Sequence, residues 1–195
     1  MRVNVLLQQI RNVLQDGEGT YWDDSELLGY YNECKRSMAS ERLELKTSAT
    51  LVLDPLKNEY DTSGILRYIK CKDADGTKRE LYPNDDSGED DTDGVVILAY
   101  NRVYVNDPTV GDTLTFQIIA LPPEDNLTSE VRFNDENAFK YYVLSKAYEK
   151  ETDSENFAKS DVFYSKYKRE FDRLLDASSV NYTASSVDKT EAKFY

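Results

Sequence analysis

One stretch near the start of the chain, residues 21–28, constrains the fold more than any other. Asp23 has the chemistry of a helix N-cap, and Glu26, three residues later, completes the pattern of a capping box. Trp22 directly precedes the cap and Leu27 follows it by four residues, which is the spacing of a hydrophobic staple. Because a staple sets the angle at which a chain enters a helix, the sequence predicts a turn and a sharply aimed helix here.

Helices are predicted on both sides of this stretch. Apolar residues recur at helical spacing from Val3 to Leu14, and Gly17 and Gly19 follow to break that helix. The next helix is predicted from about residue 24 to 44, apolar along one face in its first half and charged in its second. Such a half-amphipathic helix suggests either a second partner or a solvated end.

Residues 47–133 have the pattern of a β region. Short apolar or alternating runs lie at 50–53, 65–71, 95–100 and 114–120, and Asp75-Gly76 predicts a hairpin turn. Pro122-Pro123 ends the last run. Five or six short strands predict a compact antiparallel sheet or a small sandwich, inserted between two helical pairs.

A second helical pair is predicted over 134–175, with a break at 152–154. Tyr164 and Tyr167 combine an apolar ring with a polar tip, which suits an interface, although packing inside the bundle is the alternative. The predicted class is therefore α+β. Two helical hairpins, residues 1–46 and 134–175, form a small bundle around an inserted antiparallel β domain, residues 47–133.

The C-terminal residues 176–195 are small and polar with isolated apolar anchors, so we expect an extended tail. A tail of this kind binds a neighbour by adding a strand or by docking its anchors in pockets, and a frayed terminus is the alternative. The candidate anchors are Val180, Tyr182, Val187, Phe194 and Tyr195.

The run 85–94 is the most acidic in the chain. Glu89, Asp91, Asp93 and Gly94 match the first half of an EF-hand loop, but Tyr100 stands where the bidentate glutamate belongs. We expect an acidic loop here. A weak divalent-cation site is the other possibility that the sequence leaves open.

The composition restricts the functional classes. The chain has 24 basic and 37 acidic residues, a formal charge of −13, so we expect no basic stripe and repulsion of DNA. It has no histidine, which removes the commonest general base, and we expect neither enzyme activity nor a cofactor. Cys34 and Cys71 fit small buried apolar residues. No window has the length and hydropathy of a membrane span.

Three groups of residues carry a resemblance to a known family. The first is the run 16–33, with its aromatic-Trp-acid-Asp-x-Glu-Leu-Leu pattern followed by Tyr-x-Asn; the second is Tyr60-Asp61-Thr62 at a strand start; the third is the aromatic pattern of 138–175. In this order the chain resembles the head-to-tail adaptor (connector) proteins of tailed bacteriophages. Ser63-Gly64 departs from the acidic or prolyl residue usual in that family, which puts the turn there in doubt.

The resemblance implies a structural virion protein of the neck, assembled in the host cytoplasm as a ring of twelve copies on the portal protein. Such a ring joins the head to tail or nozzle proteins, and DNA passes through its channel without specific binding. In a ring, the partner of the exposed helical residues is the next subunit. The candidate interface residues are Arg36, Arg42, Tyr164 and Tyr167. The alternative function is a carbohydrate- or receptor-binding β module on a helical stalk, supported by the tyrosines of the β region.

Overall fold

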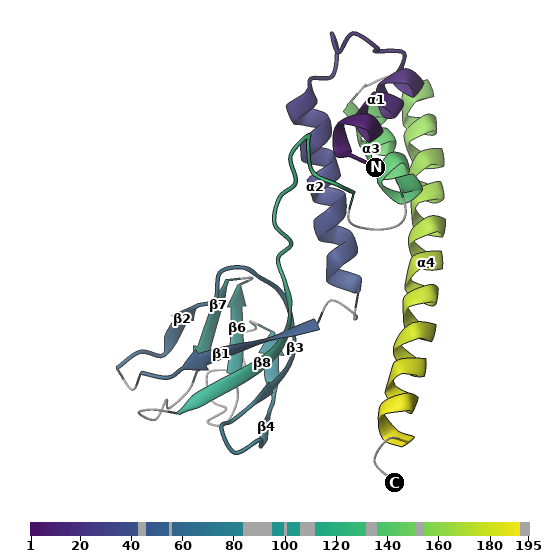
Figure 1. Ribbon diagram of the computed structural model, residues 1–195. Coiled ribbons are helices and arrows are strands. Elements are labelled where there is room, and N and C mark those ends of the chain that lie inside the picture. The colour runs from purple at the N-terminus through teal and green to yellow at the C-terminus, as the bar shows by residue number, and fades with distance from the viewer. Residues whose placement is uncertain are drawn as a thin grey trace. The chain divides into compact units, whose positions relative to one another are not determined.

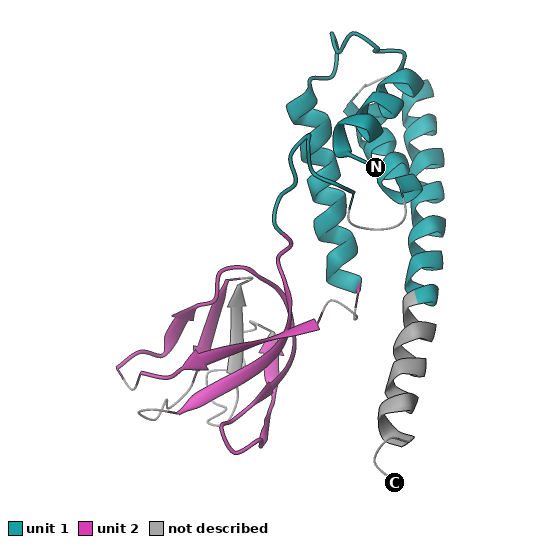
Figure 2. Cartoon of the chain, in the orientation of Figure 1, with its two compact units in different colours: residues 1–41, 123–195 teal, residues 42–122 magenta. Residues whose placement is uncertain are grey.

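The computed structural model describes residues 1–42, 46–54, 56–83, 95–99, 101–105, 112–131, 136–150 and 154–191. The chain divides into two compact units (Figure 2). Residues 1–41 and 123–195 form a helical unit, and residues 42–122 form a β unit inserted into it. The α+β class predicted from the sequence is confirmed.

The described part of the helical unit consists of four helices, α1 (Val3–Leu14), α2 (Asp24–Glu41), α3 (Glu136–Lys150) and α4 (Ser154–Glu191) (Figure 1). All four contribute to one core, because each has an apolar stripe at helical spacing. Its largest fully buried side chains include Tyr31 of α2, Phe139 of α3 and Tyr167 of α4. The rings of Tyr31 and Phe139 stack with their centroids 4.6 Å apart.

The C-terminal segment differs from the extended tail that the sequence suggested. α4 continues without interruption from Ser154 to Glu191, so the backbone of residues 176–191 is helical. The segment contains neither glycine nor proline, and therefore nothing in it stops a helix that has already formed. The sequence predicts the end of the helix from the loss of large apolar residues after Leu175. That loss removes side chains that pack on a core, but it does not interrupt the backbone hydrogen bonds of the helix.

The β unit contains two four-stranded sheets. The first has the order β1 (Lys46–Val52), β8 (Thr113–Ala120), β3 (Ile65–Lys72), β4 (Lys78–Arg79). The second has the order β2 (Glu59–Asp61), β7 (Arg102–Val105), β6 (Val95–Ala99), β5 (Leu81–Pro83). All pairings are antiparallel except β5 with β6, which is parallel. Leu114, Phe116 and Ile118 of β8 are central to the buried core of this unit.

The predicted hairpin at Asp75-Gly76 is present, with Gly76 in the left-handed region at φ 91° and β3 paired to β4 across it. The simple alternation expected along β3 is wrong, because its register with β8 shifts twice. Each shift adds a residue to the strand and changes which side chains face the core. Ile65, Tyr68 and Cys71 belong to the core of this unit, whereas Arg67 is exposed.

The end of the β unit lies at residue 122 by its contacts, whereas the sequence placed it at 133. Residues 123–131, which we call the strap, group with the helical unit. The strap satisfies free backbone donors at the start of α1, since the amides of Val3 and Asn4 donate to the carbonyls of Ser129 and Leu127 at 2.9 and 3.0 Å.

Candidate functional site

The turn between α1 and α2 is built around a buried ion pair. α1 ends at Gln15, a non-glycine residue in the left-handed region at φ 58°, upstream of the glycines expected to break it. The Asp16 carboxylate accepts hydrogen bonds from the backbone amides of Thr20, Tyr21 and Trp22 at 2.9–3.3 Å. These bonds, that of Trp22 first, hold the pKa of Asp16 below its usual value.

Arg11 closes the same turn from the other side. Its guanidinium contacts the Asp16 carboxylate at 3.1 Å and the Asp24 carboxylate at 2.7 Å, and it also donates to the carbonyl of Trp22. The side chains of Arg11 and Asp16 are both about nine-tenths buried or more, at 6% exposed each. One cation and one anion therefore fix the entire connection between the first two helices.

The predicted entry to α2 is present in the structure. The Asp23 carboxylate accepts from the amide of Glu26 at 2.7 Å, which is the N-cap bond. Trp22 and Leu27 lie in the same buried core, as a staple requires. The Glu26 carboxylate, however, accepts from the Tyr30 hydroxyl and the Lys150 ammonium at 3.1 and 2.8 Å, so it ties α2 to α3 in place of completing the capping box.

A second buried ion pair holds the strap against α2. The Lys35 ammonium lies 2.7 Å from the Asp125 carboxylate and donates to the carbonyl of Pro123 at 2.6 Å. Asn32 forms two bonds with the backbone of Asp125, accepting from its amide at 2.9 Å and donating to its carbonyl at 3.1 Å. The Tyr31 hydroxyl contacts the same carboxylate at 3.3 Å. These bonds fix the start of the strap to α2, in addition to the backbone bonds that join its end to the start of α1.

Two tyrosine–carboxylate bonds reinforce the helical unit, one between α3 and α2 and one within α2. The Tyr142 hydroxyl donates to Glu33 at 2.8 Å, which joins α3 to α2. Burial, followed by the hydrogen bond to Glu33, raises the pKa of Tyr142 well above its usual value. Burial and the bond to Glu26 raise the pKa of Tyr30 to about 12. Both hydroxyls therefore act as neutral donors at physiological pH.

Sequence reasoning missed Arg11, Asp16, Lys35 and Asp125. A signal for the two cations was present, since Arg11 shares an apolar helix face with Leu7 and Leu14, and Lys35 follows Tyr31 by one turn. A charge on an apolar face predicts a buried partner. No signal identified the partner of Lys35, because Asp125 lies far away in the sequence.

Part of the exposed apolar surface of the described helical unit lies on α4. Phe157, Val162 and Tyr164 are 49%, 52% and 44% exposed. Phe157 and Tyr164 line a groove between α2, α3 and α4. Tyr167, the other tyrosine predicted for an interface, is 2% exposed and packs within the bundle against Tyr142 and Phe171, the alternative that the sequence left open.

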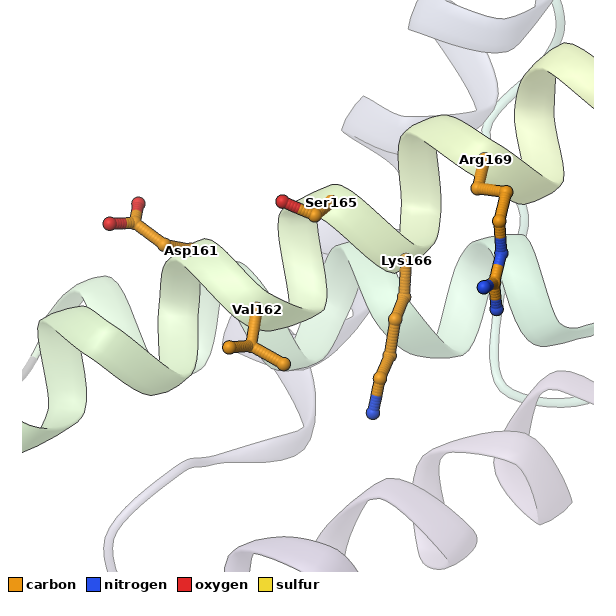
Figure 3. A pocket seen from close by; sticks show the side chains of 5 residues that line it. All are labelled: Asp161, Val162, Ser165, Lys166 and Arg169. Atoms are coloured by element: carbon orange, nitrogen blue, oxygen red, sulfur yellow. The ribbon is translucent and has the colours of Figure 1, made fainter.

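A second, shallow pocket is lined by side chains of α4 alone: Asp161, Val162, Ser165, Lys166 and Arg169 (Figure 3). Val162, Lys166 and Arg169 point to the same side of the helix (Figure 3). The Lys166 ammonium lies 5.0 Å from the centre of the Phe163 ring and is held there by a cation–π contact. An apolar side chain bordered by charges suits contact with a protein surface.

The other predicted site residues have varied positions. Arg36 is exposed and lies 3.4 Å from the Glu124 carboxylate, and Arg42 is half-buried. The helical segment 176–191 contains Val180, Tyr182 and Val187. Phe194, Tyr195 and the acidic run 85–94 lie outside the described residues.

Cys34 and Cys71 are buried free thiols, as predicted, and burial raises the pKa of both. In the described ranges, no three side chains of the His, Cys, Asp or Glu types gather as a metal site. None of the helices within the described part of the chain has the length and apolar character to cross a membrane.

The fold defines a class of protein, a helical bundle with a β unit inserted in the sequence between its two helical pairs and buried ion pairs at its connections. A family model described as SU10 adaptor protein matches residues 1–188. The chain belongs to the SU10 adaptor protein family, and the resemblance to phage head-to-tail adaptors is confirmed. A search of curated proteins found no match.

Proposed function

We propose that this chain is a structural head-to-tail adaptor that assembles as a ring of twelve copies on the portal and joins the phage head to the tail. The observation that carries the proposal is the match of the adaptor family to residues 1–188, nearly the whole chain. The role is structural, not catalytic. Its place is the neck of the virion, and the subunits assemble in the host cytoplasm.

The exposed apolar side chains of α4 support assembly with other copies. Phe157, Val162 and Tyr164 each leave about half of their side-chain surface in solvent. Phe157 and Tyr164 line one groove and Val162 lines the second pocket, and exposed apolar surface of this kind suits an interaction site. We assign this part of α4, with Arg36 and Arg42 of the second helix and its end, to the contact with the next subunit.

The C-terminal segment is the proposed contact with the portal. Residues 176–195 follow Leu174 and Leu175, which pack against the core of the bundle, and we assign them to the contact with a neighbour. The proposed anchors remain Val180, Tyr182, Val187, Phe194 and Tyr195. Tail or nozzle proteins are the partners on the other side of the ring.

The net charge of −13 fits the passage of DNA through the ring without specific binding, since a wall of the same sign as phosphate does not retain it. The alternative, a sugar-binding β module, has less support. The single tryptophan of the chain, Trp22, is 4% exposed in the helical unit, so the β unit offers no indole for stacking on a sugar.

Electron microscopy of the purified protein mixed with its portal tests the proposal. We expect a closed ring on one face of the portal, with a channel wide enough for duplex DNA. A chain that leaves the portal bare at saturating concentration would contradict the adaptor role, and bound copies that never close into a ring would contradict the ring.

A further inference from the structure

One face of the first sheet gathers lysines that lie apart in the sequence. In an antiparallel pair, directly opposite residues project from the same side of the sheet. Lys70 is opposite Gln117, and Lys72 is opposite both Thr115 and Lys78. The basic face, defined in this way, consists of Lys70, Lys72 and Lys78 with the uncharged residues Ser48, Thr50, Thr115 and Gln117.

The register thus gathers a small basic face that the acidic composition does not indicate. The face combines residues of β1, β8, β3 and β4, which lie next to one another in this order (Figure 1). None of its residues is acidic. The composition does not reveal the basic face. The lysines come to one side of the sheet through the pairing of β3 with β4 and β8.

The three lysines are exposed, and none forms an ion pair with the residues that the structure describes. The nearest acids in the sequence have other partners: Asp73 is bound by Arg79 at 2.8 Å, and Glu80 accepts from Tyr82. Lys72 and Lys78 are directly opposite each other, an arrangement of like charges that destabilises a sheet. An anionic partner on this face would relieve that repulsion.

We propose that the basic face docks the acidic run 85–93 of a second copy of this chain. The run supplies six carboxylates, from Asp85, Asp86, Glu89, Asp90, Asp91 and Asp93, and no basic residue. Residues 84–94 are roughly 36 Å long when extended, and because both ends join the paired strands β5 and β6, the run can project at most about 18 Å, which suits a neighbour in direct contact. The pairing gives each copy one donor and one acceptor surface, as a ring requires, so the inference rests on the assembly proposed above.

A protein partner fits this face better than DNA does. Three lysines would release few counterions from a duplex, and the rest of the chain carries a large acidic excess that repels phosphate. A second copy of the same chain supplies that acidic excess as the attractive partner. Contacts of this kind orient neighbouring copies and fix their register.

Zero-length carbodiimide cross-linking of the full chain tests the contact without the portal. An equal mixture of unlabelled and heavy-isotope protein is cross-linked at high concentration and digested. We expect peptides that join Lys70, Lys72 or Lys78 to residues 85–93 with mixed isotopes, because the two ends come from different copies. Cross-links confined to one isotope would show an intramolecular contact, and the absence of this cross-link would equally overturn the proposal.

Charge exchange adds a second readout. Lys70→Glu with Lys72→Glu and Lys78→Glu should lower the fraction of dimer measured by analytical ultracentrifugation about tenfold, as expected for three lost surface ion pairs. The matched control Arg2→Glu with Lys57→Glu and Lys140→Glu alters the net charge equally, lies outside the proposed interfaces and should leave the fraction of dimer nearly unchanged. A combined variant that also carries Asp90→Lys, Asp91→Lys and Asp93→Lys exchanges the charges of the two surfaces and should restore the dimer.

Failure of the exchange variant to restore dimers, or an equal loss in the control, would refute the contact. Loss of binding to a labelled DNA duplex in the first variant alone, with dimers retained, would identify DNA as the partner and also overturn the proposal. Failure of the adaptor role is distinguishable from these outcomes. A bare portal with the mixed-isotope cross-link intact would contradict the adaptor role, and a ring on the portal without that cross-link would contradict only this inference.

Discussion

Substitution of Lys35 by methionine is the sharpest test of how the strap is held. The Lys35 and Asp125 side chains are 3% and 2% exposed, and their charged atoms lie 2.7 Å apart. Lys35→Met retains most of the apolar volume of the side chain but leaves the Asp125 carboxylate buried with only the Tyr31 hydroxyl near it, at 3.3 Å. Removing one partner of a buried ion pair costs about 3–5 kcal/mol of the free energy of unfolding.

The adjacent residue provides a matched control. Arg36 forms an ion pair with Glu124 at 3.4 Å, and both of these side chains are solvent-exposed. Arg36→Met removes the same charge from the same helix, and its cost should stay below about 1 kcal/mol. The double variant Lys35→Met with Asp125→Leu should recover most of the loss, because it replaces the whole pair with apolar groups.

The assay is urea denaturation followed by the emission of Trp22, the single tryptophan of the chain, which is buried in the helical core. Its emission reports on the helical unit and not on the β unit. Equal small losses for Lys35→Met and Arg36→Met would refute the reasoning and show that the Asn32 bonds and the backbone bonds to the start of α1 hold the strap without the ion pair. A double variant that is as unstable as Lys35→Met would show that the cost arises from packing, not from an unpaired charge.

Four other predictions concern the entry to α2, the buried carboxylate of Asp16, the C-terminal segment and the assembly state. Trp22→Ala should cost about 3 kcal/mol and more than Asp23→Ala, measured by circular-dichroism melts; negligible shifts for both would assign Trp22 to a partner site. Because the folded pKa of Asp16 is lowered, its contribution to stability is present above its unfolded value of 3.8 and is lost as the pH falls through the folded pKa. Asp16→Asn should flatten this acid transition in denaturation curves. Deleting 176–195 should abolish portal attachment in sedimentation while the melting temperature changes little. The free wild-type protein should sediment mainly as a monomer and form rings on portal, since copies of charge −13 repel one another and a template offsets this.

The entry to α2 could be predicted because it depends on local patterns. The pairings of residues that lie far apart in the sequence could not be predicted. The Asp23 cap and the staple depend on residues within one turn of the chain, so the sequence contains all their partners. The Lys35–Asp125 pair joins α2 to a segment on the other side of the inserted β unit. A sequence indicates that a lysine on an apolar face needs an anion, but which of the 37 acidic residues supplies it depends on the fold.

The same distinction explains the β unit. The hairpin turn at Asp75-Gly76 was predictable because Asp-Gly favours one turn geometry. The two register shifts along β3 were not, since a bulge is determined by the packing of the neighbouring strand. The basic face depends on that register, and for this reason neither the composition nor the linear order of the lysines indicated it.

The helical course of residues 176–191 changes what the C-terminal segment can do for the proposed portal contact. As an extended chain this segment would reach roughly 53 Å and would offer its backbone for strand addition. As a continuation of α4 it covers roughly 24 Å and its backbone hydrogen bonds are already formed. Val180 and Val187 are then about two helical turns apart along the backbone. The helical backbone therefore favours one mode of portal binding over strand addition. In this mode the helix enters a groove of the portal and contacts it through positions one and two turns apart.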